Sequence, residues 1–227
     1  MSAPLYRRLI AEGLGTAMLL ATVIGSGIMG ARLANGTVGL ALLANAIATG
    51  AMLVVLILIF GPLSGAHFNP IVSLAEAFRR NLQWKELGPF VIVQVAGAIA
   101  GVWTAHLMFD LSVFELSNTF RTGPSQWFSE AVASFGLLLT VFGCMANAPK
   151  ATPYAMGLYI TAAYWFTAST SFANPAVTIA RAFSDTFAGI APQNVAAFVA
   201  AQIAGTIAAI MLRRWLWPLS RREISSR

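Results

Sequence analysis

Six long apolar stretches follow one another along the chain, and short polar segments separate them. A helix rises about 1.5 Å per residue, so about 20 apolar residues cross the roughly 30 Å hydrocarbon core of a bilayer. The pattern therefore predicts an all-α membrane protein with six transmembrane helices. We expect these helices at residues 5–29, 38–60, 87–109, 127–146, 152–167 and 194–217.

The start of the first stretch has a second interpretation. Arg7 and Arg8 precede the apolar run, which is also how a cleaved signal peptide begins. Glu12 and the length of the run favour a helix that is retained instead. We therefore take residues 5–29 as the first span.

An Asn-Pro pair occurs twice in similar surroundings, within residues 65–72 (GAHFNPIV) and within residues 171–178 (SFANPAVT). Asn is a favoured helix N-cap, and Pro is a favoured first helical residue. Each pair thus predicts a helix, over residues 71–79 and 176–183. Ten helical residues cover roughly 15 Å, about half of the hydrocarbon core, so neither helix spans a membrane alone. The sequence predicts two re-entrant half-helices.

The second half of the chain repeats the first. Three landmarks recur in the same order with offsets of 118, 105 and 108 residues, namely Glu12 and Glu130, Asn69 and Asn174, and Gln94 and Gln202. We predict a single channel domain, 1–227, built from repeat 1–115 and repeat 120–227. Because each repeat has three spans, the two repeats have inverted topology, and the half-helices enter from opposite faces. Their Asn-Pro ends are expected to meet near the midplane.

Composition and charge agree with this assignment. Of the 227 residues, 58% are apolar and 10% are charged, as in polytopic membrane proteins. The net charge of +6 indicates topology and not nucleic-acid binding, because eleven of the fourteen Lys and Arg fall on one side of the predicted spans. The positive-inside rule makes that side cytoplasmic and places both termini there, in a cell inner (plasma) membrane. The eleven are Arg7, Arg8, Arg79, Arg80, Lys85, Lys150, Arg213, Arg214, Arg221, Arg222 and Arg227; Arg32, Arg121 and Arg181 fall opposite.

The meeting point of the two half-helices predicts the function. Non-helical backbone at membrane depth is tolerated only where protein buries it or where it lines a water-filled cavity. The loop carbonyls are thus expected to line an aqueous path, with the Asn69 and Asn174 amides as donors. Two facing helix N-termini are a barrier to cations and protons, so neutral polar solutes pass most easily. The loop carbonyls are those of Gly65, Ala66, His67, Phe172 and Ala173.

Both motifs, the six-span inverted repeat and the two glutamates resemble the aquaporin and aquaglyceroporin family. The resemblance covers nearly the whole chain and implies a homotetramer in the lipid bilayer with one pore per subunit. It also implies that Glu12 and Glu130 accept hydrogen bonds from the backbone of the re-entrant loops. The family's Asn-Pro-Ala is Asn-Pro-Ile in the first copy. The implied pore centre is formed by Asn69, Pro70, Ile71, Asn174, Pro175 and Ala176.

The second motif departs from the family at the residue after Asn-Pro-Ala, where an arginine usually lines the outer constriction. Val177 occupies that position. The family's spacing places the other constriction residues at Thr49, Ala162 and Ser171, and all of them are small. An isopropyl group has neither the hydrogen-bonding fork nor the charge of a guanidinium. The constriction is therefore expected to be wide, to lack its fixed cation and to favour larger neutral solutes.

Arg181 lies four residues after Val177 and hence on the same face of the second half-helix. Its side chain either reaches back toward the constriction or forms a basic outer vestibule, or it snorkels to the interface or pairs with Asp185. Asn-Pro-Ala-Val, with Thr, Ile, Ala and Arg following, resembles aquaglyceroporins associated with bacterial arsenic-resistance operons. That resemblance implies passage of metalloid hydroxides such as arsenous acid, and of methylated arsenicals, beside glycerol-like polyols and water.

Two other classes of function compete with a channel. An ion-coupled secondary transporter also uses inverted repeats and broken helices, but it needs a titratable group at the midplane, and only Glu12 and Glu130 qualify. An enzyme is disfavoured because eight acidic residues, two His and one Cys form no catalytic constellation by spacing. We also expect no cofactor and no metal. The sequence predicts a passive channel for small neutral solutes that excludes protons.

Overall fold

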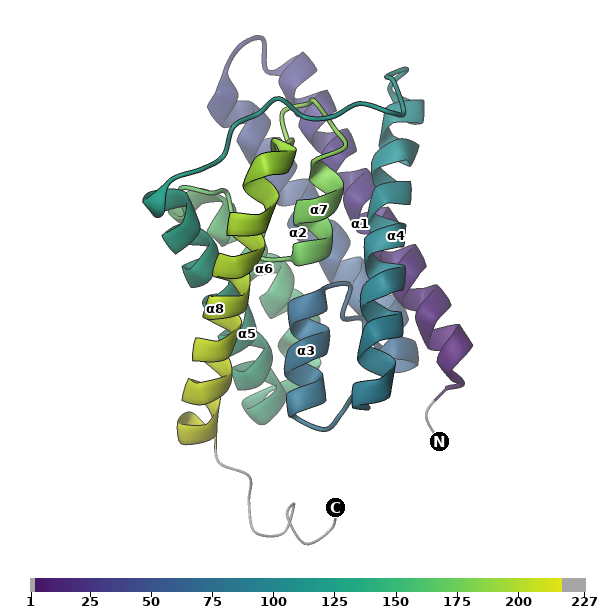
Figure 1. The fold of residues 1–227 in the computed structure, drawn as a ribbon, viewed down its shortest axis with the longest axis vertical. Helices are drawn as coiled ribbons and strands as arrows, with labels where there is room; N and C mark the ends of the chain where they lie inside the picture. Colours follow the sequence, from purple (N-terminus) through teal and green to yellow (C-terminus); the bar gives the residue numbers. More distant parts are fainter. Residues whose placement is uncertain (1–2, 218–227) are drawn as a thin grey trace, which may run out of the picture.

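A computed structural model describes residues 3–217 of the chain, and the regular secondary structure within them is helical. Six long helices and two short ones follow one another in the predicted order (Figure 1). The long helices are α1 (Leu5–Leu33), α2 (Val38–Ser64), α4 (Trp84–Met108), α5 (Pro124–Asn147), α6 (Thr152–Phe166) and α8 (Pro192–Leu216). The short helices are α3 (Pro70–Phe78) and α7 (Pro175–Arg181), and a 3-10 turn, η1 (Pro149–Ala151), precedes α6.

Among the six long helices of the described residues, five have both the length and the hydropathy of a membrane span. The exception is α6, whose 15 residues cover roughly 22 Å. That is less than a hydrocarbon core of about 30 Å, although η1 lengthens the helical segment by three residues. The predicted fifth span is thus a helix in the expected place, but it is shorter than the other five.

The two half-helices begin as the sequence predicts. The Asn69 side chain accepts a hydrogen bond from the backbone N–H of Ile71, and Pro70 is the first helical residue. Asn174 accepts from both Ala176 and Val177 at the start of α7. In each case the side-chain oxygen satisfies donors that have no partner within the helix. Helix α7 ends at Arg181, two residues before the predicted end at residue 183.

The four helices of each half pack in the same pattern. In the first half α1 contacts α2 and α4, and in the second half α5 contacts α6 and α8. The halves interlock through α4 with α7, α3 with α8, and α2 with α6. Figure 1 shows that α3 and α7 start near the middle of the molecule and run in opposite directions. This arrangement agrees with the predicted inverted repeat.

Glycines let the helices of each half cross at close range. A Cβ atom on Gly97 of α4 would lie 2.2 Å from the carbonyl oxygen of Gly13 in α1. In the second half, a Cβ on Gly205 of α8 would lie 2.1 Å from the carbonyl oxygen of Ala131 in α5. Small residues at such crossings allow backbones to approach closely in membranes. The two crossings bring the glutamates of α1 and α5 close to the loops that precede α3 and α7.

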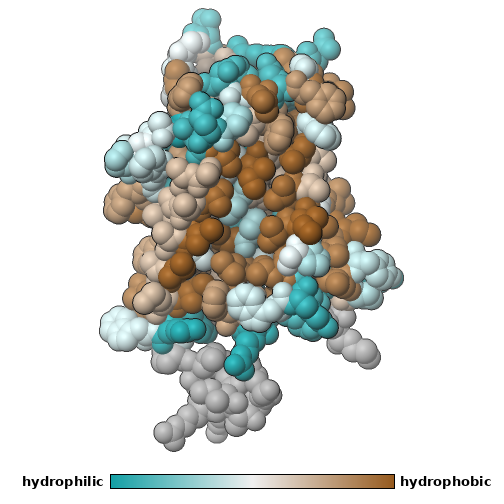
Figure 2. Space-filling model, viewed as in Figure 1, coloured by the Kyte–Doolittle hydropathy of each residue, from teal (hydrophilic) through white to brown (hydrophobic). Residues whose placement is uncertain are grey.

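The surface has the polarity expected in a bilayer. Figure 2 shows apolar side chains around the middle of the molecule and polar ones toward both ends. The beginning of α1 and the end of α8 lie at the same end (Figure 1). Most of the cations assigned to the cytoplasmic side belong to segments at this end. The three predicted there at Arg221, Arg222 and Arg227 lie outside the described residues.

Candidate pore and its outer constriction

The loops that lead into the half-helices share an unusual backbone. Gly65 and Ala66 have φ values of 93° and 50°, and the equivalent residues Thr170 and Ser171 have values of 62° and 50°. The residues directly before the two asparagines, Phe68 and Ala173, are also in the left-handed region. Non-glycine residues persist there only when the surroundings hold them. Both loops are thus held in the same strained shape.

Glu12 holds the first loop. Its Oε1 atom accepts hydrogen bonds from the Ser64 hydroxyl at 2.6 Å and from the backbone N–H of His67 at 2.9 Å. Its Oε2 atom accepts from the backbone N–H of Phe68 at 2.7 Å and from the Gln94 amide at 2.9 Å. The carboxylate thus satisfies two loop N–H groups that would otherwise be buried without partners.

Glu130 holds the second loop in the same way. Its two oxygens accept from the backbone N–H groups of Phe172 and Ala173 at 2.8 and 2.9 Å. The Gln202 amide donates to the same carboxylate at 2.6 Å and to the Thr178 hydroxyl at 2.8 Å. Both glutamates are fully buried, and both lie where the resemblance placed them, beside the backbone of the loops.

The two motifs bind each other across the centre of the molecule. The side-chain nitrogen of Asn69 donates to the carbonyl of Ala173 at 2.8 Å, and that of Asn174 donates to the carbonyl of Phe68 at 2.8 Å. An amide nitrogen has two hydrogens, so each asparagine has one donor left over. Both asparagines line a cavity, and this second donor is available to a solute in it.

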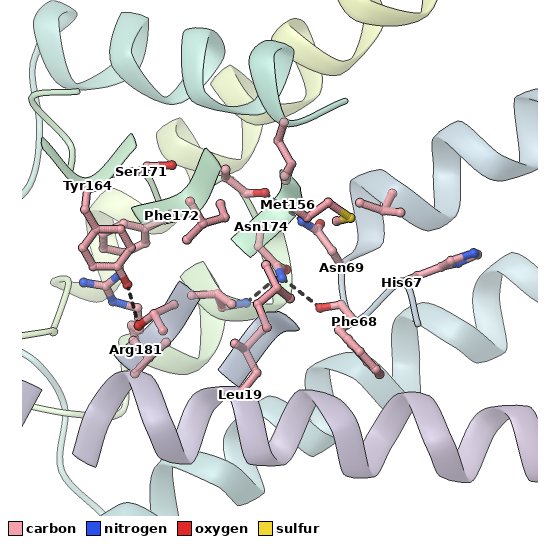
Figure 3. A pocket seen from close by; sticks show the side chains of 18 residues that line it. Leu19, His67, Phe68, Asn69, Met156, Tyr164, Ser171, Phe172, Asn174 and Arg181 are labelled. Carbon is pink, nitrogen blue, oxygen red and sulfur yellow. Dashed lines mark hydrogen bonds between the residues drawn. The ribbon is translucent and has the colours of Figure 1, made fainter. Parts of the chain in front are cut away.

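The cavity is narrow, with a volume of about 50 Å³. A water molecule needs about 10–15 Å³ of such space, so the cavity holds only a short file of water-sized molecules. Figure 3 shows Arg181, Phe172 and Tyr164 at one end, the two asparagines in the middle and His67 at the other end.

A wider vestibule adjoins the narrow cavity, and His67 lines both. Its volume is about 470 Å³, and the carbonyl-bearing loop residues Gly65 and Ala66 line it. Arg8 and Glu86 also line it and form a salt bridge at 3.0 Å. The path therefore opens on the side where α1 begins into a larger and more polar space.

Three of the four residues predicted for the outer constriction line the narrow cavity, namely Thr49, Ser171 and Val177. The prediction for Ala162 is wrong, because this residue is exposed on the outer face of α6. The α6 residues in the cavity wall are Met156, Ile160 and Tyr164, spaced four apart along one face. Two residues of helix rotate a side chain by about 200°, which turns Ala162 away from that face. Tyr164 replaces it, and its hydroxyl lies 3.3 Å from the Thr49 hydroxyl.

Arg181 lies inside the cavity wall and not in an open vestibule. Its side chain is 2% exposed, which contradicts snorkelling to the interface. Asp185 is bound elsewhere, to the backbone and side-chain amides of Asn118 at 2.9 Å each. Arg181 lines the same cavity as Val177, so a cationic side chain belongs to its wall although position 177 has none.

The remaining residues predicted for the pore centre have a structural role. Pro70, Ile71, Pro175 and Ala176 are buried in the first turns of α3 and α7 and are not part of the cavity wall. Of the predicted pore centre, the asparagines alone reach the cavity.

Sequence reasoning missed several residues of the wall. Phe172 was expected to line the path with its carbonyl, and its ring was not anticipated. The Phe172 and Tyr164 rings reduce the width that small residues alone would leave. Tyr164 has no signal in the sequence beyond its spacing of four from Ile160. Apolar side chains from three other helices complete the wall, namely Leu19, Val23, Leu53 and Leu137.

The connection between α4 and α5 passes over the end of α7 (Figure 1). Its Ser117 N–H donates to the carbonyl of Ala182 at 2.9 Å, and Arg121 donates to the carbonyl of Gly189 at 2.8 Å. The hydrogen bonds from the Asn118 backbone and then from its side chain hold the pKa of Asp185 below its ordinary value. These bonds tie the connection to the segment that follows α7.

Comparison with known proteins agrees with this geometry. The sequence pattern described as "Major intrinsic protein" matches residues 1–171. Aquaglyceroporin AqpS of Rhizobium meliloti (strain 1021) is 56% identical over 212 residues, which cover 93% of this chain and 91% of that protein. Aquaporin NIP1-1 of Zea mays is 31% identical over 145 residues, which cover 63% of this chain and 50% of that protein.

The fold also resembles a solved structure, the X-ray structure of the aquaglyceroporin from Plasmodium falciparum. The TM-score is 0.71 with 18% sequence identity, and the match covers 99% of this chain and 100% of the other. At this identity the likeness concerns the fold alone. Together with the sequence matches, it establishes that the chain belongs to the major intrinsic protein family, whose aquaglyceroporins are membrane channels and not enzymes.

Proposed function

We propose that the protein is a passive transmembrane channel for water and small neutral solutes such as glycerol-like polyols, and that it excludes protons. The observation that carries the proposal is the pair of Asn69 and Asn174 amides, each bound to the opposite loop and each with a donor left in the narrow cavity. These donors orient a solute oxygen at the midpoint. The N-termini of α3 and α7 add positive partial charge there, which opposes cations and protons.

The finer proposal concerns which solutes pass. We assign metalloid hydroxides such as arsenous acid, and methylated arsenicals, to the same path. One support is the Asn-Pro-Ala-Val motif, which resembles that of aquaglyceroporins associated with bacterial arsenic-resistance operons. The other is the set of small residues in the cavity wall, Thr49, Ser171 and Val177. Tyr164 and Arg181 narrow the path on other sides, so solutes pass in single file.

The loop carbonyls have a proposed role as acceptors along the path. Those of Gly65, Ala66 and His67 serve the wide vestibule, and those of Phe172 and Ala173 serve the narrow cavity. Support comes from the residues themselves, which line those two spaces, and from the alternating left-handed backbone of both loops. A passing hydroxyl is a donor and needs such acceptors.

We also propose a homotetramer in the plasma membrane, with one pore in each subunit of residues 1–227 and both termini in the cytoplasm. Large apolar side chains are exposed on the long helices, among them Ile47 and Leu158, at 54% and 70%. They are suited to lipid or to a second subunit. The orientation rests on the excess of cations at the end where α1 begins.

The test is stopped-flow light scattering of proteoliposomes under gradients of water, glycerol, urea and arsenous acid. Each flux is expected to exceed that of protein-free vesicles, to saturate weakly, and to be independent of a proton or sodium gradient. Fluxes equal to those of protein-free vesicles contradict the channel function. Permeability to water and glycerol without arsenous acid contradicts the finer proposal alone.

A further inference from the structure

Two polar groups in the wall of the narrow cavity lack partners. Arg181 is 2% exposed, yet its Nη1 atom has no hydrogen-bond acceptor within residues 3–217. Ser171 is also 2% exposed, and its hydroxyl is likewise unpartnered in that part of the chain. A buried charged donor without an acceptor is costly, so its presence calls for an explanation. A solute in the cavity supplies the missing partner.

The remaining contacts of Arg181 fix its guanidinium without neutralising it. The Cζ atom lies 3.4 Å from the centroid of the Phe172 ring, a cation–π contact, and Nε donates to the carbonyl of Ala188. Phe172 is itself held edge-to-face by Phe198, with the ring centroids 5.2 Å apart. The salt bridges in the described part of the chain do not involve Arg181. The guanidinium is therefore oriented by its neighbours, and its charge is left for the cavity.

We propose that Arg181 is the specificity-determining cation of the outer constriction and that it binds an oxygen of a neutral, hydroxyl-bearing solute. The inference rests on the channel function proposed above and assigns to Arg181 the charge that Val177 does not provide. The guanidinium, which lines the cavity, donates an N–H to the solute oxygen. The hydroxyls of Ser171, Thr49 and Tyr164 line the same cavity and both donate and accept.

The rest of the wall selects the shape of the solute. Leu19, Val23 and Val177 give the cavity an apolar surface. A solute with hydroxyls and a carbon edge therefore matches both parts of the wall. The four residues from Val177 to Arg181 advance α7 by about 6 Å, so the cation stands farther from the central asparagines than a residue at position 177 would. Inorganic and organic cations meet this charge before they reach the asparagines.

The test compares Arg181→Met with a matched control, Arg121→Met. Methionine has similar length and no charge or donor. Arg121 contacts the same Phe172 ring at 5.3 Å, but it donates to the backbone carbonyls of Gly189 and Phe187 and does not line the cavity. Each variant is reconstituted at equal density. The readouts are the ratio of glycerol to water permeability and the leak of methylammonium ions.

Arg181→Met is expected to lower the glycerol-to-water ratio and to raise the methylammonium leak, each at least about tenfold, as for the loss of one charged hydrogen bond. Arg121→Met is expected to stay within about twofold of the unmodified protein. If the two variants behave alike, the assignment is overturned. A protein that conducts neither solute before mutation contradicts the channel function instead.

A second variant covers the case in which Arg181→Met does not fold, as judged by gel filtration and circular dichroism. Arg181→Gln removes the charge and keeps a neutral N–H donor on a shorter side chain. It is expected to raise the methylammonium leak at least about tenfold, with a smaller change in the glycerol-to-water ratio. An unchanged leak in folded Arg181→Gln overturns the assignment.

Discussion

The side-chain nitrogen of Asn174 lies 2.8 Å from the carbonyl oxygen of Phe68, a residue 106 positions earlier in the chain. Asn69 and Ala173 form the reciprocal bond. Each asparagine therefore caps its own half-helix with its oxygen and binds the opposite loop with its nitrogen. The two halves of the chain are joined at the point where solutes must pass.

Asn174→Ala removes both the cap and the bond to Phe68. A lost cap costs about 1 kcal/mol, and a lost neutral hydrogen bond costs about as much again, so we expect about 2 kcal/mol lower stability. Thermal unfolding in detergent measures the change. Asn147→Ala is the control, because that amide bonds only within its own helix, to the carbonyl of Gly143. Equal loss in the two variants contradicts the role of Asn174.

Glu12→Gln replaces a carboxylate that accepts four hydrogen bonds with an amide that accepts fewer. The new NH₂ group faces N–H and O–H donors, and each charged hydrogen bond contributes about 1.5–3 kcal/mol. We expect a loss of about 2–4 kcal/mol in stability and, in the protein that remains folded, flux that is still passive. The control is Glu115→Gln, in the connection between α4 and α5, which is expected to change neither the stability nor the flux.

The same variant separates the channel from an ion-coupled transporter. All four donors point at the Glu12 oxygens and hold the loop that precedes α3. A proton carrier at this position would require the loop to move. Flux in the unmodified protein that follows a proton or sodium gradient, and that folded Glu12→Gln loses, establishes the transporter and refutes the passive channel.

Gly97→Ala tests the crossing of α1 and α4. The added Cβ lies 2.2 Å from a backbone oxygen, which cannot move aside as a flexible side chain can. We expect the α1–α4 contact to open and stability to fall by more than about 2 kcal/mol. Gly88→Ala in the same helix meets nothing within 4 Å and is expected to stabilise by about 0.5–1 kcal/mol. If Gly97→Ala leaves the stability unchanged, the close packing of α1 against α4 is contradicted.

The bond between Asp185 and Asn118 predicts a pH dependence of the outer connection. The pKa of Asp185 is lowered from 3.8 in the folded protein, so its stabilising effect is fully present above that value and is lost as the pH falls through the lowered pKa. Hydrogen exchange of residues 111–123 is expected to be faster in Asp185→Asn than in the unmodified protein at pH 6. The difference is expected to shrink as the pH falls through the lowered pKa, and a difference that stays constant over that titration contradicts the role of the Asp185–Asn118 bonds.

Local sequence patterns were sufficient to predict the half-helices and the two glutamates that bind their loops. Asn-Pro fixes a cap and a first turn wherever it occurs, and its repetition beside matched Glu and Gln residues fixes the symmetry. The left-handed backbone at Phe68 and Ala173 left no such signal, because neither residue favours that conformation. Glu12 and Glu130 impose it from helices that are distant in sequence.

The outer constriction could be predicted only in part. Thr49, Ser171 and Val177 were reached by counting from the asparagines, but counting across residues 167–174 assumed a fixed loop length and placed Ala162 in the wall in error. The position of the Arg181 side chain could not be predicted by counting along the chain. Its position follows from the Phe172 ring and from the Ala188 carbonyl, and no pattern in the sequence indicates either contact.

Val177→Arg adds a second guanidinium one turn nearer the central asparagines. Because residues four apart share a helix face, the new side chain projects toward the same cavity as Arg181, where like charges repel and the volume is about 50 Å³. Water needs the least space, so glycerol and arsenous acid fluxes are expected to fall at least about tenfold while water flux falls less than about threefold. Stopped-flow light scattering measures all three, and Val177→Met separates the effect of size from that of charge. An equal reduction of every flux refutes the prediction, since it would mean that Val177→Arg blocks the path without discriminating by size.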